Sequence, residues 1–366
     1  MRQKKKSPDF VLFLIVMSLL SLGVVMVFSA SEYSTMVNYN DSFHYFKQQL
    51  AWALLGLVAM FIMVRYDYWR LKRYILPIII IAFVLLVMVL IPGIGREVND
   101  ARRWIDLGLL RFAPAELVKL CIIIFTAYGL SQQKGRINNF NGILPYLIVM
   151  VLAAGLILLQ PDLGTAMSLA CIVLIMLFAA GARMAHLGSM AVAGIVAIGF
   201  AIALEPYRMR RFLAFLDPWA DPLDTGFHTI QGLYAIGSGG LFGLGLGQSK
   251  QKFLYLPENH TDFIFAIIGE ELGFIGASLV ILLFALFIWR GLKIAVTSTD
   301  PFASLLATGI TAWVGIQAVI NIGGVTGSLP VTGITLPFIS YGGTSLLLTM
   351  IGVGVLLNIS RFTAAR

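Results

Sequence analysis

Residues 10–28 read FVLFLIVMSLLSLGVVMVF, and this run without a charged side chain decides the class of fold. A helix that spans a bilayer needs about 20 predominantly apolar residues, which this run nearly provides. Arg2 and residues 4–6 precede it, as basic residues precede the apolar part of a signal peptide. That part has only about 7–15 residues in a signal peptide, however, and more apolar runs follow here. We therefore predict an uncleaved first membrane-spanning helix.

The composition extends this prediction to the whole chain of 366 residues. Hydrophobic residues make up 59%, against about 45–50% in soluble proteins, and charged residues make up only 12%. The mean hydropathy of +0.89 excludes a set of soluble domains. Further apolar runs follow the first at about 49–64, 74–91, 114–130, 143–159, 164–180, 187–204, 263–289, 304–325 and 343–358. We predict an all-α, polytopic membrane protein of about ten transmembrane helices, forming one domain over residues 1–366.

The distribution of charge predicts how these helices are oriented. An even number of spans puts both termini on one side of the membrane. The loops and ends of that side carry fifteen Lys and Arg and three Asp and Glu, whereas the opposite loops carry ten and fourteen. Because cytoplasmic loops are enriched in Lys and Arg, both termini are predicted to be cytoplasmic. The two longest loops, 92–113 and 205–262, then lie outside, the second between the seventh and eighth helices.

Several classes of chemistry find no support in the sequence. There is no Walker A motif, no His-Glu-x-x-His motif and no Cys/His zinc spacing, so an ATP-driven pump within this chain is excluded and no metal site is predicted. Both cysteines lie in apolar runs, so no disulfide framework is indicated. The basic excess is explained by loop orientation, and nucleic acid is not an expected partner.

Glu116 and Lys119 are charged residues inside the fourth predicted span. A charge at the bilayer centre costs about 2.5–3.5 kcal/mol on insertion scales, so such residues mark functional sites or pairs. Their i, i+3 spacing puts them on one helix face. They form either a structural ion pair that fixes helix packing or a pair that borders a polar, substrate-binding cavity.

Arg102, Arg103 and Trp104 form a second polar cluster, in the outer loop 92–113. Adjacent guanidinium groups suit phosphate or pyrophosphate, because Arg donates hydrogen bonds in a planar fork. Trp104 would then stack on a sugar. The alternative is ordinary anchoring of this cluster at the membrane interface.

Asp262 stands at the start of the eighth span, directly before the apolar run that begins at Phe263. It is either the cap of that helix or a general base facing an outer cavity, where partial burial raises its pKa. Glu270 lies eight residues further, on roughly the same helix face. The two carboxylates would form an acidic stripe that descends into the membrane.

Residues 326–345 contain too many Gly and Pro residues for a regular helix. Non-helical backbone at membrane depth must line a cavity or be buried in protein. We expect a wall of a substrate groove or a re-entrant loop, with Ser340 and Tyr341 among the residues that contact substrate. A broken helix of a transporter has the same pattern.

Four motifs together resemble the SEDS family of shape, elongation, division and sporulation proteins, over nearly the whole chain. They are Asn99-Asp100-Ala101-Arg102-Arg103-Trp104-Ile105, the turn Gln160–Gly164, the stretch Pro257–Ala266 with Gly269–Gly273, and the stretch Pro330–Gly343. Within the family the sequence looks most like the sporulation branch, with the division branch next. One departure is Ala113-Pro114-Ala115-Glu116, where the family often has Gln-Pro-Ser-Glu.

The resemblance implies a peptidoglycan glycosyltransferase with ten helices in the bacterial cytoplasmic membrane. Such an enzyme polymerises lipid II on the outer face and works with a class B penicillin-binding protein, a transpeptidase. The essential aspartate of the family matches Asp262, and its membrane Glu/Lys pair matches Glu116 and Lys119. Its arginine–tryptophan loop matches Arg102, Arg103 and Trp104. No resident cofactor is expected, although Mg²⁺ or Mn²⁺ bound with the pyrophosphate is an alternative to guanidinium groups.

Two other functions remain open at this point. A lipid II flippase would need polar groups that are accessible from both faces, whereas the polar clusters here fall mainly on the outer side. A non-catalytic scaffold for the transpeptidase would leave Asp262 and the Glu116–Lys119 pair without a task. The sequence therefore favours the polymerase.

Overall fold

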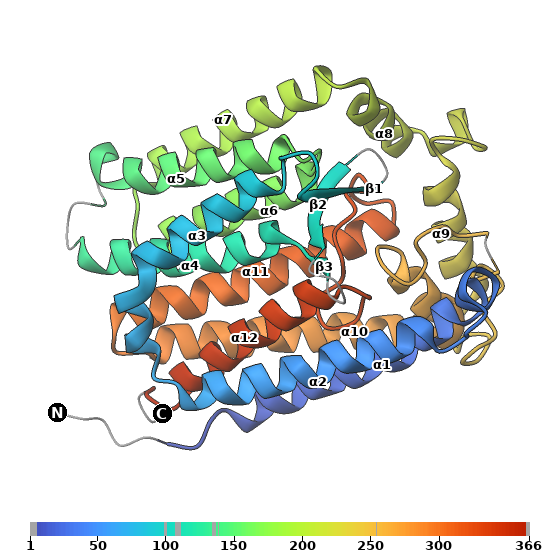
Figure 1. The fold of residues 1–366 in the computed structure, drawn as a ribbon, viewed down its shortest axis with the longest axis horizontal. Coiled ribbons are helices and arrows are strands. Elements are labelled where there is room, and N and C mark those ends of the chain that lie inside the picture. Colours follow the sequence, from blue (N-terminus) through green and yellow to red (C-terminus); the bar gives the residue numbers. More distant parts are fainter. Residues whose placement is uncertain are drawn as a thin grey trace.

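The computed structural model describes residues 6–98, 101–106, 111–133, 137, 139–253 and 255–363. Its long helices run side by side along the horizontal axis of Figure 1. They are α1 (Phe10–Tyr39), α2 (His44–Arg65), α3 (Ile75–Met88), α4 (Pro114–Gln132), α5 (Phe140–Leu158), α6 (Leu163–Ala179), α7 (Met184–Ala203), α10 (Ile264–Thr297), α11 (Pro301–Val325) and α12 (Gly343–Ser360). Shorter helices are α8 (Pro206–Leu216), α9 (Phe227–Ser238) and the 3-10 turns η1 (Tyr68–Tyr74) and η3 (Pro218–Ala220).

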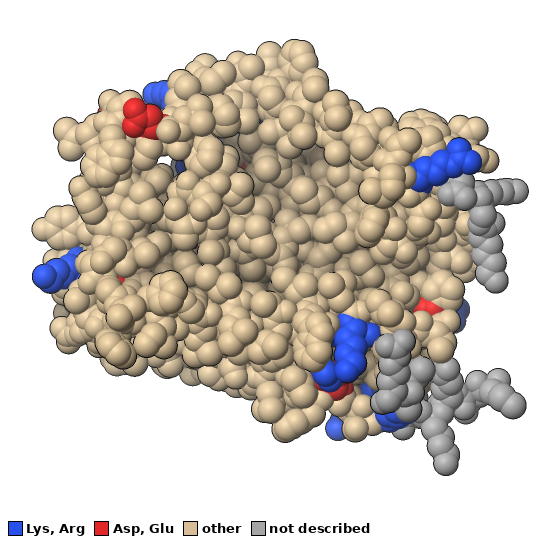
Figure 2. Space-filling model, turned by 180° about the vertical axis from the view of Figure 1, so that it is seen from behind, with Lys and Arg blue, Asp and Glu red and all other residues tan. Residues whose placement is uncertain are grey.

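The predicted helical membrane protein is confirmed. Nine helices of the described residues are long and apolar enough to cross a membrane, with η1 and α3 counted as one. The tenth predicted run is α6, a shorter apolar helix of 17 residues. Figure 2 shows a broad surface without Lys, Arg, Asp or Glu, and these residues gather near the two ends of the molecule. The uncharged band is the surface that lipid covers, since lipid tails solvate apolar side chains.

A small antiparallel sheet occupies the loop between α3 and α4, and the sequence analysis does not predict it. Its strands are β1 (Gly95–Val98), β2 (Ala101–Asp106) and β3 (Arg111–Phe112), in the order β1-β2-β3. Isolated short strands are marginal, so the sheet depends on packing against the helices. The motif residues Asn99 and Asp100 lie outside the described residues.

Both ends of the described chain lie at the same end of the bundle, as an even number of spans requires (Figure 1). The Lys6 backbone N–H donates to the Arg361 carbonyl at 3.0 Å. Asp9 caps α1 by accepting from the Leu12 N–H at 2.9 Å and pairs with Arg290 of α10. We call this the terminal end, and the opposite end, which carries the sheet, α8 and α9, the Asp262 end.

The core of the bundle lies around α11, whose apolar window is mostly buried, whereas α7 is almost entirely exposed. α11 packs against α10, α4 and α6, and α12 packs against α2. Glycine permits the close approach of α12 and α2, because a Cβ at Gly354 would lie 2.6 Å from the Met60 carbonyl oxygen. Helix association in lipid depends on such close packing of small residues.

Candidate functional site

Asp262 lies two residues before the start of α10, at the end of the bundle that also carries the sheet, α8 and α9. The residue at the N-cap position of α10 is Phe263, and no side chain caps this helix. Within the described part of the chain, the Asp262 carboxylate accepts no hydrogen bond. The capping role considered from the sequence is therefore wrong. The carboxylate is left available for another partner.

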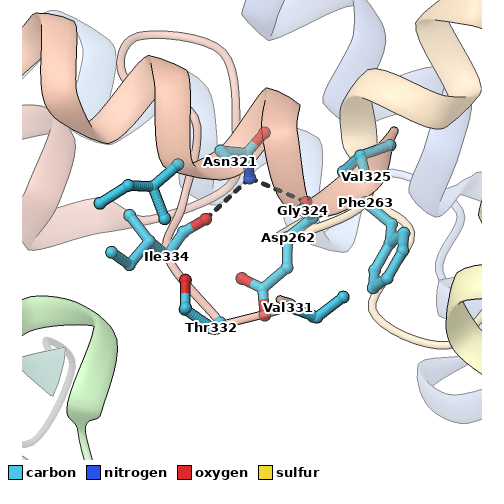
Figure 3. A pocket seen from close by; sticks show the side chains of 10 residues that line it. Asp262, Phe263, Asn321, Gly324, Val325, Val331, Thr332 and Ile334 are labelled. Atoms are coloured by element: carbon cyan, nitrogen blue, oxygen red, sulfur yellow. Dashed lines mark hydrogen bonds between the residues drawn. The ribbon is translucent and has the colours of Figure 1, made fainter. Parts of the chain in front are cut away.

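The carboxylate faces a small pocket, with a cavity volume of about 10 Å³, between the start of α10, the end of α11 and the loop that precedes α12 (Figure 3). In Figure 3 it points toward the loop segment at Thr332. A Cβ on Gly333 would lie 3.4 Å from Asp262 Oδ2, and Gly333 has φ +77°. A glycine at this position thus keeps space open beside the carboxylate and accepts a backbone conformation that other residues rarely adopt.

The surroundings of Asp262 suit a general base. Burial, together with the neighbouring Glu258, raises the pKa of its carboxyl to about 7. The guanidinium groups of Arg211 and Arg103 oppose this pKa increase, so two cations from different elements act on the same carboxylate. Because a base works best when its pKa lies near the operating pH, this environment fits proton abstraction at neutral pH.

Hydrogen bonds from three residues hold the segment around Asp262 against the loop that precedes α12. Asn321 of α11 donates from Nδ2 to the Asp262 carbonyl at 2.8 Å and to the Ile334 carbonyl at 2.7 Å (Figure 3). The Ser340 hydroxyl donates to the Thr261 carbonyl at 2.6 Å and accepts from the Leu336 N–H at 2.8 Å. The Tyr341 N–H donates to the His260 carbonyl at 2.9 Å.

Ser340 and Tyr341, both predicted to contact substrate, thus differ in how accessible their side chains are. Ser340 is 3% exposed and its hydroxyl is used within the chain, so the geometry assigns it to positioning the Asp262 segment. Tyr341 is half-buried and its ring stays partly accessible. The predicted cavity wall is confirmed for this segment, since Val331–Ile334 line the pocket and the loop is non-helical.

Arg102 and Arg103 are neighbours on β2, where the register with β1 shifts between Arg96 and Glu97, and their guanidinium groups have different partners. Arg102 binds Glu97 Oε2 through Nε at 2.9 Å and Nη2 at 2.7 Å. Arg103 donates to the carbonyls of Gln160 and Pro161, which anchors the sheet on the turn between α5 and α6. The two guanidinium groups thus have different partners: Arg102 pairs with exposed Glu97, and the Arg103 charge acts on Asp262. Their binding of a pyrophosphate stays a prediction.

Trp104 follows on the same strand, opposite Arg96 of β1, and is half-buried. No ring contact involves it among the described residues. The predicted stacking on a sugar stays a prediction.

The predicted ion pair between Glu116 and Lys119 is confirmed. Lys119 Nζ lies 2.7 Å from Glu116 Oε1, and the side chains are 0% and 14% exposed respectively. Lys119 Nζ also lies 5.5 Å from the ring centre of Trp313 on α11. Ser345 of α12 donates to Glu116 Oε2 at 3.1 Å. The pair therefore joins α4, α11 and α12.

The first turn of α12 supplies hydrogen bonds at the start of α4, where Ala113 and Ala115 replace the polar residues of the family pattern. Ala113 has no polar side chain, but its N–H donates to Thr344 Oγ1 at 3.3 Å. Together with the Ser345 contact, this supplies hydrogen bonds at the start of α4 from a neighbouring helix.

Glu270 does not face the pocket, which corrects its predicted role in substrate binding. It is 1% exposed and accepts from the Ser249 hydroxyl at 2.5 Å and the Lys250 N–H at 2.9 Å. Glu271 lies beside it and accepts a hydrogen bond from the Ser29 hydroxyl at 2.7 Å. Asp262 lies outside α10, so the predicted stripe does not form. Glu270 and Glu271 instead anchor the Gly-rich loop 239–252, which wraps around a kink of α10 at Gly273.

The sequence analysis missed Asn321, Gly333, Arg211 and His228. An amide in the apolar run 304–325 was the available signal for Asn321. His228 of α9 packs edge-on against Phe263, with ring centres 6.1 Å apart, and burial lowers its pKa. Arg211 of α8 is exposed, stacks 4.5 Å from the ring centre of Tyr207 and makes no ion pair with a described acid. Its charge is therefore available beside Asp262.

Comparison with known proteins gives concordant results. The family model of the FtsW, RodA and SpoVE proteins, described as cell cycle proteins, matches residues 10–365. Stage V sporulation protein E of Bacillus subtilis is 48% identical over 364 residues, which cover 99% of this chain and 100% of the relative. A probable peptidoglycan glycosyltransferase FtsW of Trichlorobacter lovleyi is 46% identical, over 96% of this chain and 93% of the relative.

Solved structures show the same fold. A chain described under "Structural coordination of polymerization and crosslinking by a peptidoglycan synthase complex" matches with a TM-score of 0.81 and 32% identity, covering 97% of this chain and 98% of the other. The rod shape determining protein RodA of Thermus thermophilus matches with a TM-score of 0.73 and 29% identity, covering 98% of each chain. The similarity therefore includes the whole bundle and both of its ends.

Proposed function

Because the chain belongs to the FtsW, RodA and SpoVE family of cell cycle proteins, we propose that it is a peptidoglycan glycosyltransferase that polymerises lipid II. The observation that carries this proposal is the Asp262 carboxylate. It has no hydrogen-bond partner among the described residues, faces a pocket and has a pKa of about 7. A scaffold protein has no need for such a group.

Polymerisation joins a sugar hydroxyl of one glycan to the anomeric carbon of another, which carries an undecaprenyl-pyrophosphate. In the proposed step Asp262 takes the proton of the attacking hydroxyl, whose oxygen forms the new glycosidic bond. The bond between the anomeric carbon and the pyrophosphate oxygen breaks, and the pyrophosphate leaves with the bonding electron pair. General base catalysis of this kind contributes about 10²–10⁴-fold.

The leaving pyrophosphate needs positive charge. Arg103 and Arg211 are the cations whose charges act on Asp262, and they come from β2 and α8 on different parts of the chain. We infer that they flank the leaving group, with Arg211 free to donate in a fork. Among the described residues no three His, Cys, Asp or Glu side chains lie close enough to hold a metal ion. A divalent cation would therefore enter on the oxygens of the pyrophosphate itself.

The proposed setting follows from the same arrangement. The long polyprenyl tail lies in lipid against the uncharged band, and the Asp262 end faces outward if the charge distribution sets the orientation. The reaction partner is a class B penicillin-binding protein, which crosslinks the strands that this chain makes. The assignment to sporulation or division depends on which transpeptidase binds.

The test is polymerisation of purified lipid II by the purified protein, alone and with the transpeptidase. We expect glycan strands from the wild type and a loss of about 10²–10⁴-fold in Asp262→Asn, since an amide cannot accept the proton. A folded Asp262→Asn variant with wild-type turnover would remove Asp262 from the mechanism. Transport of lipid II across liposomes without polymer would favour the flippase, and partner binding without either activity would favour the scaffold.

A further inference from the structure

Five aromatic rings from separate segments form a cluster beside the Asp262 segment. They belong to Tyr39 at the end of α1, His44 and Tyr45 at the start of α2, His260, and Tyr341. Tyr45 lies at the centre, 4.5 Å from the ring centre of His260 and 4.8 Å from that of Tyr341. The Tyr39 ring stacks on His44 at 4.1 Å. We call these five residues the aromatic cluster.

Hydrogen-bonding groups border the aromatic cluster. Exposed Gln48 accepts from the Tyr341 hydroxyl through Oε1, and its Nε2 lies 3.0 Å from His44 Nε2. The Tyr341 N–H is bonded to the carbonyl of His260, which precedes Asp262 by only two residues. The rings and their polar edges are thus fixed relative to the carboxylate.

The aromatic cluster is partly accessible, and three of its five rings are uncharged phenols. Tyr39 is 50% exposed, and the other four rings are half-buried. Burial lowers the pKa of His260, with Glu258 acting in the opposite direction, so its imidazole is neutral. The nearby Lys47 is paired with Asp41 at 2.9 Å. Arg111, whose charge acts on Tyr341, lies 3.8 Å from Asp106, so both of these described cations are close to carboxylates. The ring faces themselves suit an uncharged ligand.

An uncharged, amphipathic ring fits this surface best. The C–H face of a pyranose packs on an aromatic ring, and its hydroxyl or acetamido groups bond to phenol, imidazole and amide edges. Interfacial tyrosines that only anchor a protein have no reason to assemble in one stack beside a reactive carboxylate.

We propose that the aromatic cluster is a saccharide subsite, which holds a pyranose of the glycan next to Asp262. The inference rests on the proposed function for its choice of ligand. The sugar belongs either to the growing strand or to the incoming lipid II, and the two sources differ in effect. Loss of a strand subsite shortens the product, whereas loss of a lipid II subsite raises the KM for lipid II.

The variant Tyr39→Ala tests the proposal, because Tyr39 is exposed and ends α1, so the fold should tolerate its truncation. We expect either a mean strand length reduced by roughly two- to tenfold or a KM raised by that factor, the range for loss of one aromatic contact. Tyr39→Trp should restore the wild-type value. The matched control is Tyr74→Ala, because Tyr74 is 46% exposed and lies at the terminal end.

Unchanged strand length and KM in Tyr39→Ala, or an equal change in Tyr74→Ala, would overturn the subsite. A second measurement does not depend on turnover: binding of a soluble N-acetylglucosamine oligomer to detergent-purified Asp262→Asn protein, followed by saturation-transfer NMR. Binding that Tyr39→Ala removes supports the subsite even if no variant polymerises lipid II, in which case only the proposed function fails. Equal binding, or none, in both proteins counts against the subsite while polymerisation by the wild type stands.

Discussion

At the scale of the residue, the central feature is one carboxylate whose environment separates it from the other acids of the chain. Glu116 is paired with Lys119, and Glu270 and Glu271 accept hydrogen bonds from a loop. Asp262 alone among these four has neither kind of partner within the described residues. Because burial disfavours its charged form and no hydrogen bond from a described residue compensates, the pKa of Asp262 is raised.

This pKa predicts how activity depends on pH. The carboxylate must be charged to accept a proton, so kcat/KM should rise with pH along a limb centred near pH 7. The measurement is the pH profile of strand synthesis from lipid II under conditions where the protein stays folded. A profile that is flat between pH 5 and 8 would contradict the assignment of Asp262 as base.

The same pKa predicts a change in stability of the opposite sense. The folded pKa of about 7 lies above the usual aspartate value of 3.8, so the native state binds more protons than the unfolded state between these pH values. The contribution of Asp262 to stability therefore falls as pH rises through this range. Asp262→Asn, which stays neutral, should gain thermal stability relative to wild type at pH 8 but not at pH 4. An equal difference in melting temperature at both pH values would refute a raised pKa.

At the scale of the element, α11 connects the site to the core. Asn321 ties the start of α10 to the loop wall, and Trp313, two helical turns earlier, lies over Lys119. Between them Gln317 is 1% exposed, and neither of its amide atoms has a hydrogen-bond partner among the described residues. The three side chains share one helix face, since they are spaced four residues apart.

This difference between Asn321 and Gln317 supplies a matched pair of substitutions. Asn321→Leu removes two hydrogen bonds of about 1 kcal/mol each and frees the Asp262 segment, so kcat should fall more than KM changes. Gln317→Leu removes amide atoms that make no hydrogen bond among the described residues, so activity should persist and the melting temperature should be equal or higher. Equal kinetics for the two variants would show that Asn321 does not position Asp262.

The ion pair on α4 makes a separate prediction. Reversing one charge, as in Glu116→Lys, leaves like charges buried together, and loss of one partner of a buried pair costs about 3–5 kcal/mol. Reversing both, as Glu116→Lys with Lys119→Glu, should recover much of the folded yield. A double-mutant cycle by thermal unfolding in detergent measures the coupling, and purely additive effects would exclude a functional pair.

At the scale of the whole molecule, the two ends of the bundle carry different tasks. The terminal end joins both ends of the chain through Asp9, Arg290 and Arg361, whereas the Asp262 end carries the sheet, α8, α9 and the pocket (Figure 1). Substrate polymerised outside the cell requires the Asp262 end to face outward.

Cysteine labelling tests this orientation. Leu223 is 88% exposed in the segment between α8 and α9, and Thr299 is exposed in the turn between α10 and α11 at the terminal end. A membrane-impermeant thiol reagent added to intact cells should label Leu223→Cys but not Thr299→Cys, which should label only after permeabilisation. The reverse pattern would overturn the outward position of the site and, with it, the proposed function.

The spans, the family and one local contact could be predicted from the sequence alone. Each spanning helix satisfies its own backbone hydrogen bonds, so apolar length alone reveals it. The pairing of Glu116 with Lys119 was predictable because residues at i and i+3 meet on any helix. Asp262 was a candidate for a general base because an acid stands at the boundary between a polar loop and an apolar run.

Only the tertiary structure decided which polar groups remain free to act. Glu270 accepts hydrogen bonds from the loop 249–251, and Asn321 donates to the Asp262 carbonyl from 59 residues away. None of these contacts follows from helical or strand periodicity, because each joins elements whose relative placement depends on the packing of the whole bundle. The charge of Arg211 beside Asp262 and the assembly of five rings around Tyr45 depend on the same long-range packing.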